Sequence, residues 1–307
     1  MTRVFIDGSA GTTGLRIYER LGAREDISLI TLSEEKRKDP AARREALNEA
    51  DIAFLCLPDA AAVEAVSLID NDKTAVIDTS TAHRTADTFT YGMPELHGKR
   101  EAIAASRRIA NPGCHASGFI ALVAPLVEGK LLSPDTRLSC FSLTGYSGGG
   151  KKMIAEYEAA QRDPLLCAPR VYGLSQTHKH LPEMQALCRL THAPVFLPTV
   201  APFYSGMEVS IPLFARDVRV GLEELSAYYA DYYQKGLIRF KAGAGEGGFL
   251  SAAAFSGRDD MEISVSGNDE RMVLTARFDN LGKGASGAAI QNMNILLGVD
   301  EATGLTV

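Results

Sequence analysis

The chain has 307 residues, a formal net charge of -6 and a pI near 5.6. Apolar residues make up 46% of the chain and charged residues 23%, and no apolar run is long enough to span a bilayer. The acidic balance, with no run of interleaved basic and aromatic residues, argues against a nucleic-acid-binding surface. A chain of this length exceeds one hydrophobic core, so we predict two domains and a small-molecule ligand.

The cysteines and the first residues of the chain indicate the cellular compartment in which the protein is found. The five cysteines have an odd count and no close spacing, which argues against both a disulfide framework and a metal site. The sequence from Met1 runs directly into a strand pattern, without the pattern of a signal peptide. We therefore expect reduced thiols, no bound metal, and a cytoplasmic location.

The first third of the chain alternates strand and helix patterns. The expected strands cover residues 3–7, 27–32, 51–57, 75–79 and 108–110. This alternation is typical of the α/β class, with a doubly wound parallel sheet. Residues 52–57 are apolar on both faces, as in a central strand, so we interpret Cys56 as buried packing.

The pattern changes after residue 115. Longer strands are expected at residues 137–144, 195–201, 207–214, 262–266 and 271–278, with a few helices between them. They predict an α+β domain with a mixed, largely antiparallel sheet. Residues 284–297 have helical spacing, and we expect this helix to pack back on the first domain. The predicted domains are residues 1–112 with 284–307, and residues 113–283.

A glycine-rich loop follows the first expected strand. Gly8, Gly11 and Gly14 are spaced as GxxGxxG and lead into the first expected helix. Backbone N–H groups at such a helix start bind the pyrophosphate of a dinucleotide, as in the Rossmann fold. A tight strand-to-helix connection without a ligand is the alternative, but the position at the start of a βαβ pattern favours the cofactor.

The end of the second expected strand bears on cofactor choice. An NAD-specific fold places an acidic residue there, whereas this chain has Ser33 followed by Lys36, Arg37 and Lys38. A hydroxyl and cations suit the 2′-phosphate of NADP. A solvated charged loop, in which Glu34 and Glu35 offset the cations, is the alternative.

Cys114 is the candidate nucleophile. It follows Asn111-Pro112-Gly113 and precedes the apolar helical run of residues 119–127, so its thiol lies at a helix start. This position lowers a cysteine pKa and favours the thiolate. A buried small apolar residue is the alternative, which fits Cys140 and Cys188 better.

Two histidines offer an acid–base partner for that thiol. His178 and His180 precede a helix in the segment 177–183, and we favour His180 as the base. Residues two apart in an extended segment point to opposite sides, so we expect only one imidazole to face the thiol. A metal site is the alternative, but no third ligand stands at a recognised spacing.

Two further segments are candidate anion sites. Residues 145–152 end a strand, start a helix and contain Tyr146, Ser147 and Lys151, so their N–H groups and lysines suit a phosphate or carboxylate. Arg84 follows the fourth expected strand at the carboxyl edge of the sheet, where open α/β folds bind ligands. A flexible connector and a surface arginine are the respective alternatives.

Taken in order, these motifs carry a resemblance over nearly the whole chain. The cofactor domain, the Asn-Pro-Gly-Cys loop, the HxHxPE segment at 178–183 and the segment Asp279–Gly287 resemble the N-acetyl-gamma-glutamyl-phosphate reductases, in their shorter type-2 form. The wider superfamily includes aspartate-semialdehyde dehydrogenase. The resemblance implies an NADP-dependent enzyme of arginine biosynthesis that forms a thioester on Cys114, with residues 113–283 as a catalytic and dimerisation domain. It also implies a homo-oligomer.

The resemblance and the motifs together give the predicted site residues. The catalytic residues are Cys114 and His180. The cofactor-binding residues are Gly8, Ser9, Gly11, Thr12, Thr13, Gly14, Ser33, Lys36, Arg37, Pro58, Ser80, Asn280 and Gly282. The substrate-binding residues are Arg84, Tyr146, Ser147, Lys151 and His178. A related acyl-phosphate reductase acting on aspartyl phosphate, and a nucleotide-sensing regulator without catalysis, are the competing hypotheses.

Overall fold

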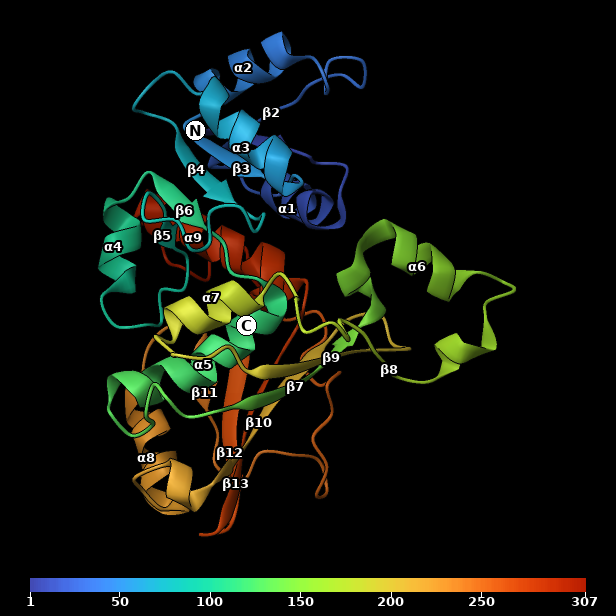
Figure 1. The fold of residues 1–307 in the computed structure, drawn as a ribbon. Helices are drawn as coiled ribbons and strands as arrows, with labels where there is room; N and C mark the ends of the chain where they lie inside the picture. Colours follow the sequence, from blue (N-terminus) through green and yellow to red (C-terminus); the bar gives the residue numbers. More distant parts are fainter. The chain divides into compact units, whose positions relative to one another are not determined.

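The computed structural model describes all residues from Met1 to Val307, which separate into two compact units (Figure 1). The first unit consists of Met1–Pro112 and Ala285–Leu305. The second consists of Gly113–Gly284 and Thr306–Val307. No helix in either unit is both long and apolar enough to cross a bilayer.

The first unit is built on a six-stranded sheet with the order β2-β1-β3-β4-β6-β5. Its strands are β1 (Thr2–Asp7), β2 (Ile27–Ile30), β3 (Ile52–Leu55), β4 (Ala75–Asp78), β5 (Thr90–Tyr91) and β6 (Arg108–Ala110). Every neighbouring pair is parallel. The predicted α/β class with a parallel, Rossmann-like sheet is confirmed, and only the two-residue strand β5 was not predicted.

Helices cover both faces of this sheet. They are α1 (Thr12–Gly22), α2 (Pro40–Glu49), α3 (Asp59–Leu68), α4 (Lys99–Ala105) and α9 (Gly287–Leu297). Alternate residues of β1 separate the two cores: Val4 packs with Ile17 of α1 and Ile290 of α9, whereas Phe5 packs with Leu47 of α2. The helix α9 thus contributes to the core of the first unit although it comes last in the chain.

The order of the strands creates a switch point beside β1. The chain passes from β1 to β2 on one side, and β3 later pairs with the other side of β1. In open parallel sheets, ligands bind at the carboxyl edge where the strand order reverses. The predicted glycine loop begins at Gly8, directly after β1, and so lies at this point.

The second unit contains a seven-stranded sheet with the order β11-β12-β13-β10-β7-β9-β8. Its strands are β7 (Ser139–Gly145), β8 (Arg170–Val171), β9 (Val195–Ala201), β10 (Met207–Phe214), β11 (Ile238–Phe240), β12 (Met261–Gly267) and β13 (Arg271–Phe278). Two neighbouring pairs, β7 with β9 and β11 with β12, are parallel, and the other four are antiparallel. The predicted mixed, largely antiparallel sheet is confirmed, and the short strands β8 and β11 were not predicted.

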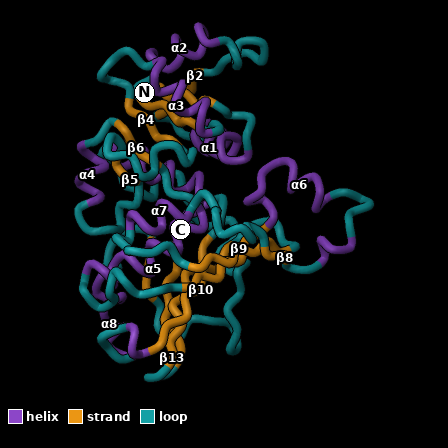
Figure 2. Tube along the Cα trace, viewed as in Figure 1, coloured by secondary structure: helices purple, strands orange, loops and turns teal.

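Helix α5 (Cys114–Glu128) is the central helix of this unit. Its residues from His115 to Leu126 are all buried, which explains an apolar sequence without a polar face. It packs against β10, β13 and α7 (Leu181–Leu187). The remaining helices are α6 (Gly150–Glu158) and α8 (Leu222–Tyr232), and Figure 2 shows long loops on either side of α6.

Candidate active site

The turn after β1 is built so that only glycine fits. Gly8 has φ +88, and a Cβ there would come within 2.3 Å of the carbonyl oxygen of Cys56. A Cβ on Gly14 would come within 2.5 Å of the carbonyl oxygen of Gly8. Gly11 is the N-cap of α1, so the loop brings its backbone tightly around the start of this helix. Such a helix start offers N–H groups to an anion.

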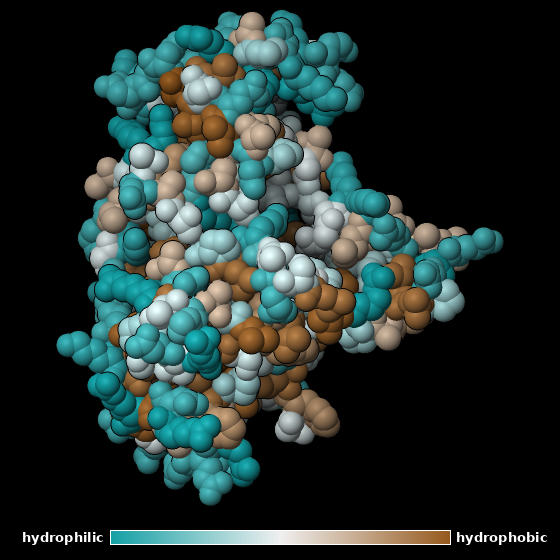
Figure 3. Space-filling view, in the orientation of Figure 1, coloured by the Kyte–Doolittle hydropathy of each residue, from teal (hydrophilic) through white to brown (hydrophobic).

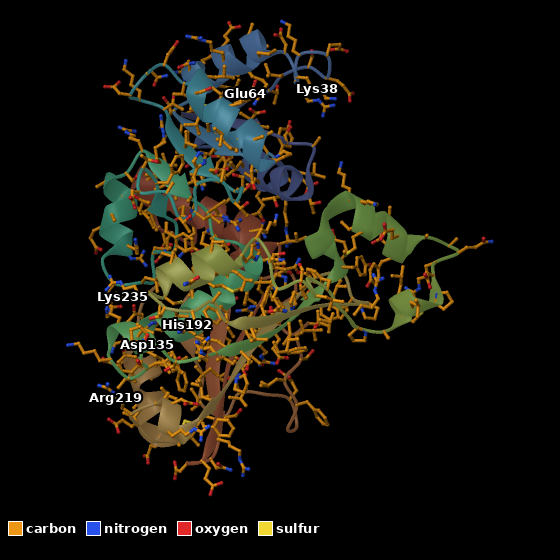
Figure 4. All side chains as sticks on the ribbon, in the orientation of Figure 1. Lys38, Glu64, Asp135, His192, Arg219 and Lys235 are labelled. Carbon is orange, nitrogen blue, oxygen red and sulfur yellow. The ribbon has the colours of Figure 1, made fainter.

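A cleft of about 620 Å³ opens beside this loop, within the first unit. Its walls include apolar side chains of Tyr18, Leu29 and Leu57, together with the cations of Arg37 and Lys38. Figure 4 labels Lys38 on the loop between β2 and α2. The cleft therefore combines an apolar wall, a glycine turn and a cationic rim.

The predicted cofactor residues of the first unit are distributed unevenly around this cleft. Gly8, Ser9 and Arg37 line it. The other predicted cofactor residues of this unit are not among its lining residues: Gly11, Thr12, Thr13, Gly14, Ser33, Lys36, Pro58 and Ser80. The reason at residues 33–37 is a turn, in which the N–H groups of Lys36 and Arg37 both donate to the carbonyl of Ser33 at 3.0 Å. Because of this turn, Arg37 and Lys38 line the cleft and Lys36 does not.

Ion pairs with carboxylates partly neutralise the positive charge of the arginines around the cleft. Arg37 pairs with Glu34 on its own turn. Asp7, at the end of β1, is buried and pairs with Arg43 at 3.0 Å. Burial raises the pKa of Asp7, and the hydrogen bond from Arg43 opposes that rise. Arg43 also pairs with Glu64, which Figure 4 labels.

Arg84 lies in the loop after β4 and is buried. Its Nε donates to the carbonyl of Asn111 at 3.0 Å and its Nη2 to the carbonyl of Thr79 at 3.1 Å. Ser80 in the same loop donates to the buried carboxylate of Asp78. Both residues hold the loop together, and their roles in ligand binding stay predictions.

In the second unit, Cys114 is the first residue of α5 and is half-buried. Gly113 before it is extended, with φ -76 and ψ 145, so the chain turns sharply into the helix at the cysteine. The N–H of Gly113 donates to the carboxylate of Glu183 on α7 at 3.2 Å. Glu183 therefore fixes the residue next to the thiol, a role that its place in the HxHxPE segment could have suggested.

The loop after β13 packs against this cysteine. A Cβ on Gly284 would lie 3.0 Å from the Cβ of Cys114, so the loop backbone packs closely on the cysteine and a side chain at this position would crowd it. The buried carboxylate of Asp279 accepts from the N–H groups of Leu281 and Gly282 at 2.7 and 2.9 Å. Because these bonds fix the loop, Gly284 stays against the thiol-bearing residue.

Asn280 in this loop is committed to protein contacts. Its Nδ2 donates to the hydroxyl of Ser147 at 3.0 Å, and its Oδ1 accepts from the N–H of Gly206 at 2.9 Å. The structure thus joins Asn280, predicted for the cofactor, to Ser147, predicted for the substrate. A Cβ on Gly282 would overlap the carbonyl of Arg258. Ligand contacts for Asn280, Ser147 and Gly282 stay predictions.

The two predicted imidazoles lie on the same side, contrary to expectation. The ring centroids of His178 and His180 are 4.8 Å apart, and each lies within 5.7 Å of the ring of His115. The expectation of opposite orientations is wrong because residues 179–180 form a turn rather than an extended strand. No group of three or more His, Cys, Asp or Glu side chains is arranged to hold a metal ion.

His115, directly after the cysteine, was not among the predicted site residues. Its Nδ1 lies 2.7 Å from the hydroxyl of Ser142, and its Nε2 lies 2.7 Å from the hydroxyl of Tyr172. Burial, with the nearby His178, lowers the pKa of His115 to about 3. Burial also lowers the pKa of His178 to about 4. Both imidazoles are therefore neutral at physiological pH.

The loop of residues 145–150 precedes α6. Tyr146 is stacked on Tyr157 with ring centroids 4.7 Å apart, and its hydroxyl donates to Glu158 at 3.2 Å. Lys151 is exposed in the first turn of α6. The substrate-binding roles of Tyr146 and Lys151 stay predictions.

The other cysteines differ from Cys114 in their surroundings. Burial raises the pKa of Cys56 to about 12, and it raises the pKa of Cys140 and Cys188 as well. Cys167 is exposed and lies near Arg162. Among the five thiols, Cys114 is the one at the first position of a long helix, directly before His115.

Comparison with known proteins agrees with this arrangement. Residues 3–106 match the family model of the semialdehyde dehydrogenase NAD binding domain, and residues 114–280 match that of the semialdehyde dehydrogenase dimerisation domain. Among solved structures, aspartate semialdehyde dehydrogenase II of Vibrio cholerae complexed with ASA has a TM-score of 0.73 at 18% identity, covering 97% of this chain and 98% of that chain. This likeness shows the same fold.

Curated relatives are closer in sequence. N-acetyl-gamma-glutamyl-phosphate reductase 2 of Nostoc sp. is 43% identical, covering 99% of both chains. The enzyme of that name from Pseudomonas putida is 45% identical over 98% of both chains, and N-acetyl-gamma-glutamyl-phosphate reductase of Chelativorans sp. is 46% identical over 96% of this chain and 98% of its own. With the parallel-sheet cofactor unit and the cysteine-bearing second unit, these matches show that the chain belongs to the N-acetyl-gamma-glutamyl-phosphate reductase family.

Proposed function

We propose that the protein reduces N-acetyl-gamma-glutamyl phosphate with NADPH, giving N-acetyl-glutamate 5-semialdehyde and phosphate in arginine biosynthesis. The observation that carries the proposal is Cys114 at the first position of α5, with His178 and His180 clustered on its neighbour His115. A thiolate and neighbouring imidazoles are what acyl transfer from an acyl phosphate needs.

The first unit fits a dinucleotide. The turn at Gly8 and Gly14 has no room for side chains and opens on a cleft of about 620 Å³. The glycine turn and the start of α1 would hold the pyrophosphate, and Arg37 with Lys38 would hold a 2′-phosphate. The bound NADPH supplies the hydride that reduces the acyl group.

The second unit supplies the nucleophile. The Cys114 thiolate attacks the acyl carbon, phosphate leaves, and a thioester forms. N–H groups in the first turn of a helix have no acceptor within the helix, so those around Cys114 are suited to stabilise the oxyanion. Glu183, through Gly113, keeps this turn in place.

The two histidines take different roles on this proposal. The Nδ1 of His178 accepts from the backbone N–H of His180 at 3.2 Å. Because His178 is neutral, its one proton is then on Nε2, where it donates to a substrate oxygen rather than accepting a proton. That leaves His180 as the acid–base group, which protonates the departing thiolate or the hemithioacetal oxygen.

The reverse reaction tests the proposal. Purified protein, given N-acetyl-glutamate semialdehyde, phosphate and NADP, is expected to form NADPH. Cys114→Ser is expected to abolish turnover while NADPH still binds, because the first unit is unchanged. Cys167→Ser, at the exposed thiol of the same unit, is the matched control and keeps its activity. Phosphate-dependent turnover by Cys114→Ser rules the mechanism out.

A substrate comparison separates this function from its nearest alternative. Activity with N-acetylglutamyl phosphate is expected to exceed activity with aspartyl phosphate. The relatives at 43–46% identity carry the former activity in their names, whereas aspartate semialdehyde dehydrogenases are similar at only 15–18% identity. A preference for aspartyl phosphate would overturn the substrate assignment.

We further propose that the protein is cytoplasmic.

We also propose that it forms a homo-oligomer through the open face of the second sheet. Four large apolar side chains are exposed on that face: Phe141, Val195, Leu197 and Phe214. Phe141 and Leu197 are register partners on β7 and β9, so they lie side by side. Figure 3 shows hydrophobic surface over these strands. A face of this kind is typical of association.

Measuring the oligomeric state tests whether this surface forms the interface. Light scattering after gel filtration is expected to give a dimer or a larger assembly for the unmodified protein. Leu197→Asp introduces an unpaired charge and is expected to give monomers. Leu174→Asp, at a more exposed leucine outside the strands, is the control and leaves the assembly intact. A monomeric unmodified protein refutes the proposal.

A further inference from the structure

We propose that the carboxylate of Asp7 accepts a hydrogen bond from the 3′-hydroxyl of the adenosine ribose of NADPH, and that Arg43 holds this carboxylate in place. The inference rests on the proposed function, in which the cleft of the first unit binds NADPH. It adds a ribose-binding residue and a positioning residue that the sequence motifs do not indicate.

Asp7 stands where strand and glycine turn meet. It is the last residue of β1, directly before Gly8. Open parallel sheets bind their ligands at this carboxyl edge. Asp7 lines the cleft together with Gly8, Arg37 and Lys38. A carboxylate therefore lies in the wall of the cleft beside the turn proposed for the pyrophosphate.

The two oxygens of this carboxylate have different surroundings. Arg43 on α2 donates from Nε to Oδ2 at 3.0 Å, and its Nη2 also lies 3.0 Å from Oδ2. Oδ1 accepts no hydrogen bond from the protein and is not enclosed by it. Asp7 is only 4% exposed and lines the cleft, so Oδ1 opens to the cleft. A buried acceptor of this kind needs a donor, which the protein does not supply.

The covalent structure of NADPH indicates which donor meets this oxygen. The adenosine ribose carries the pyrophosphate on C5′ and the additional phosphate on C2′, so its one free hydroxyl is on C3′. On the proposed function, the turn at Gly8 holds the pyrophosphate, and Arg37 with Lys38 holds the 2′-phosphate. The ribose that joins these groups then lies in the cleft that Asp7 lines. A hydroxyl donates, and a charged carboxylate only accepts.

Arg43 makes a carboxylate compatible with the phosphates of the cofactor. An unpaired carboxylate in the same cleft would repel them. Arg43 is itself buried, and besides its pair with Asp7 it pairs through Nη1 with Glu64 of α3 at 3.0 Å. It thus offsets the charge of Asp7 and fixes the side chain through Oδ2, while Oδ1 stays open to the ligand.

A purely structural role for Asp7 would account for the ion pair but not for the open oxygen. Arg43 bridges Asp7 and Glu64, and so joins β1, α2 and α3 with or without a nucleotide. That bridge uses only Oδ2. The second oxygen, open to the cleft beside the glycine turn, is the feature that points to a ligand.

A cofactor without the 3′-hydroxyl tests the inference on the unmodified protein. NADP and 3′-deoxy-NADP are titrated as competitors of NADPH, whose fluorescence reports binding without turnover. The 3′-deoxy compound is expected to bind about tenfold more weakly, because it lacks one hydrogen bond to a charged group. Equal affinities would overturn the inference.

Variants of Asp7 show whether that hydroxyl meets this carboxylate. Asp7→Ala removes the acceptor while Arg43 keeps its pair with Glu64, and the two nucleotides are then expected to bind alike. Asp7→Asn keeps a neutral acceptor of the same size, so an intermediate difference is expected. Glu64→Gln is the matched control, because Glu64 pairs with Arg43 but does not line the cleft, and it keeps the unmodified difference.

A charge-rescue pair tests the role of Arg43. Arg43→Met is expected to weaken NADP binding, because the Asp7 carboxylate then repels the phosphates. Arg43→Lys is expected to recover part of the affinity, and so is the double variant Arg43→Met with Asp7→Asn, in which no charge remains to be offset. A double variant as weak as Arg43→Met alone would show that Arg43 does not act through Asp7.

The outcomes separate this inference from the proposed function. If the unmodified protein binds neither NADP nor NADPH, the proposed function fails and the inference with it. If NADP binds and Cys114→Ser abolishes turnover, but 3′-deoxy-NADP binds as tightly as NADP, the inference alone is overturned. The same holds if the difference between the two nucleotides survives in Asp7→Ala, since the hydroxyl then has another partner.

Discussion

Arg37 and Lys38 place two cations on the wall of the cleft in the first unit, and the carboxylate of Glu34 pairs with one of them. Glu34 is exposed, so its pairing with Arg37 contributes little stability. On the proposed function, a 2′-phosphate would have to compete with this carboxylate for the guanidinium. The net positive charge that meets the cofactor would therefore be smaller than the two cations alone suggest.

Two opposite substitutions test this balance. Arg37→Ala is expected to raise the KM for NADPH about tenfold, with little change for NADH, because one charge-assisted contact to phosphate is lost. Glu34→Gln is expected to lower the KM for NADPH and to leave that for NADH unchanged. Steady-state kinetics with both cofactors measure the two effects. Equal changes for NADPH and NADH in either variant would contradict a role at the 2′-phosphate.

At the scale of elements, helix α5 contains a proline that its neighbours compensate. Pro125 has no N–H, so the carbonyl of Ala121 lacks its usual partner within the helix. The hydroxyl of Tyr233 donates to that carbonyl at 2.7 Å, and the hydroxyl of Tyr228 donates to the carbonyl of Pro125 at 2.7 Å. Tyrosines at the end of α8 thus stabilise the helix that carries Cys114.

Removing the hydroxyl of Tyr233 measures how much its hydrogen bond to the Ala121 carbonyl stabilises the fold. Tyr233→Phe is expected to lower the free energy of unfolding of the second unit by about 1–2 kcal/mol, because a buried carbonyl loses its donor. Tyr232→Phe is the matched control, since its hydroxyl bonds the exposed Glu128, and is expected to change stability by less than about 0.5 kcal/mol. Denaturant unfolding of both variants gives the comparison. Equal stability would show that the carbonyl finds another donor.

At the scale of the whole molecule, the buried imidazoles make stability depend on pH. Burial lowers the pKa of His115 to about 3, whereas an unfolded histidine has a pKa of about 6.5. Between these values the unfolded chain binds a proton that the folded chain does not. Stability is therefore full above about pH 6.5 and is lost as pH falls toward 3, by about 1.4 kcal/mol per pH unit for one such group.

Replacing His115 isolates this contribution. His115→Gln keeps a polar side chain that does not titrate, so the loss of stability below pH 6.5 is expected to be shallower. Thermal unfolding midpoints of the variant and the unmodified protein from pH 8 to 4 provide the test. His192→Gln, at a histidine that Figure 4 labels outside the imidazole cluster, is the control. Parallel curves for His115→Gln and the unmodified protein would contradict the assignment.

The sequence alone was sufficient for the parallel sheet of the first unit and for most strands of the second. Period-two and apolar strand patterns are local properties of the sequence. The spacing of Gly8 and Gly14 is local too, because a side chain at either position would clash with backbone nearby. The same holds for Cys114 at a helix start, because Pro112 and Gly113 signal the turn within the adjacent sequence. The short strands β5, β8 and β11 were not predicted, since two or three residues carry too little pattern.

Only the tertiary structure decided which side chains surround His115, the residue after the cysteine. Tyr172 and Ser142 are far from Cys114 in sequence and meet His115 because β7, α5 and the segment after β8 converge. The rings of His178 and His180 lie on the same side because residues 179–180 form a turn, which the two-residue spacing of the histidines does not predict. Local sequence determined the helix start at Cys114 and the glycine turn after β1 through backbone sterics. Long-range packing determined the hydrogen-bond partners of His115, because burial and such partners exist only in the folded chain.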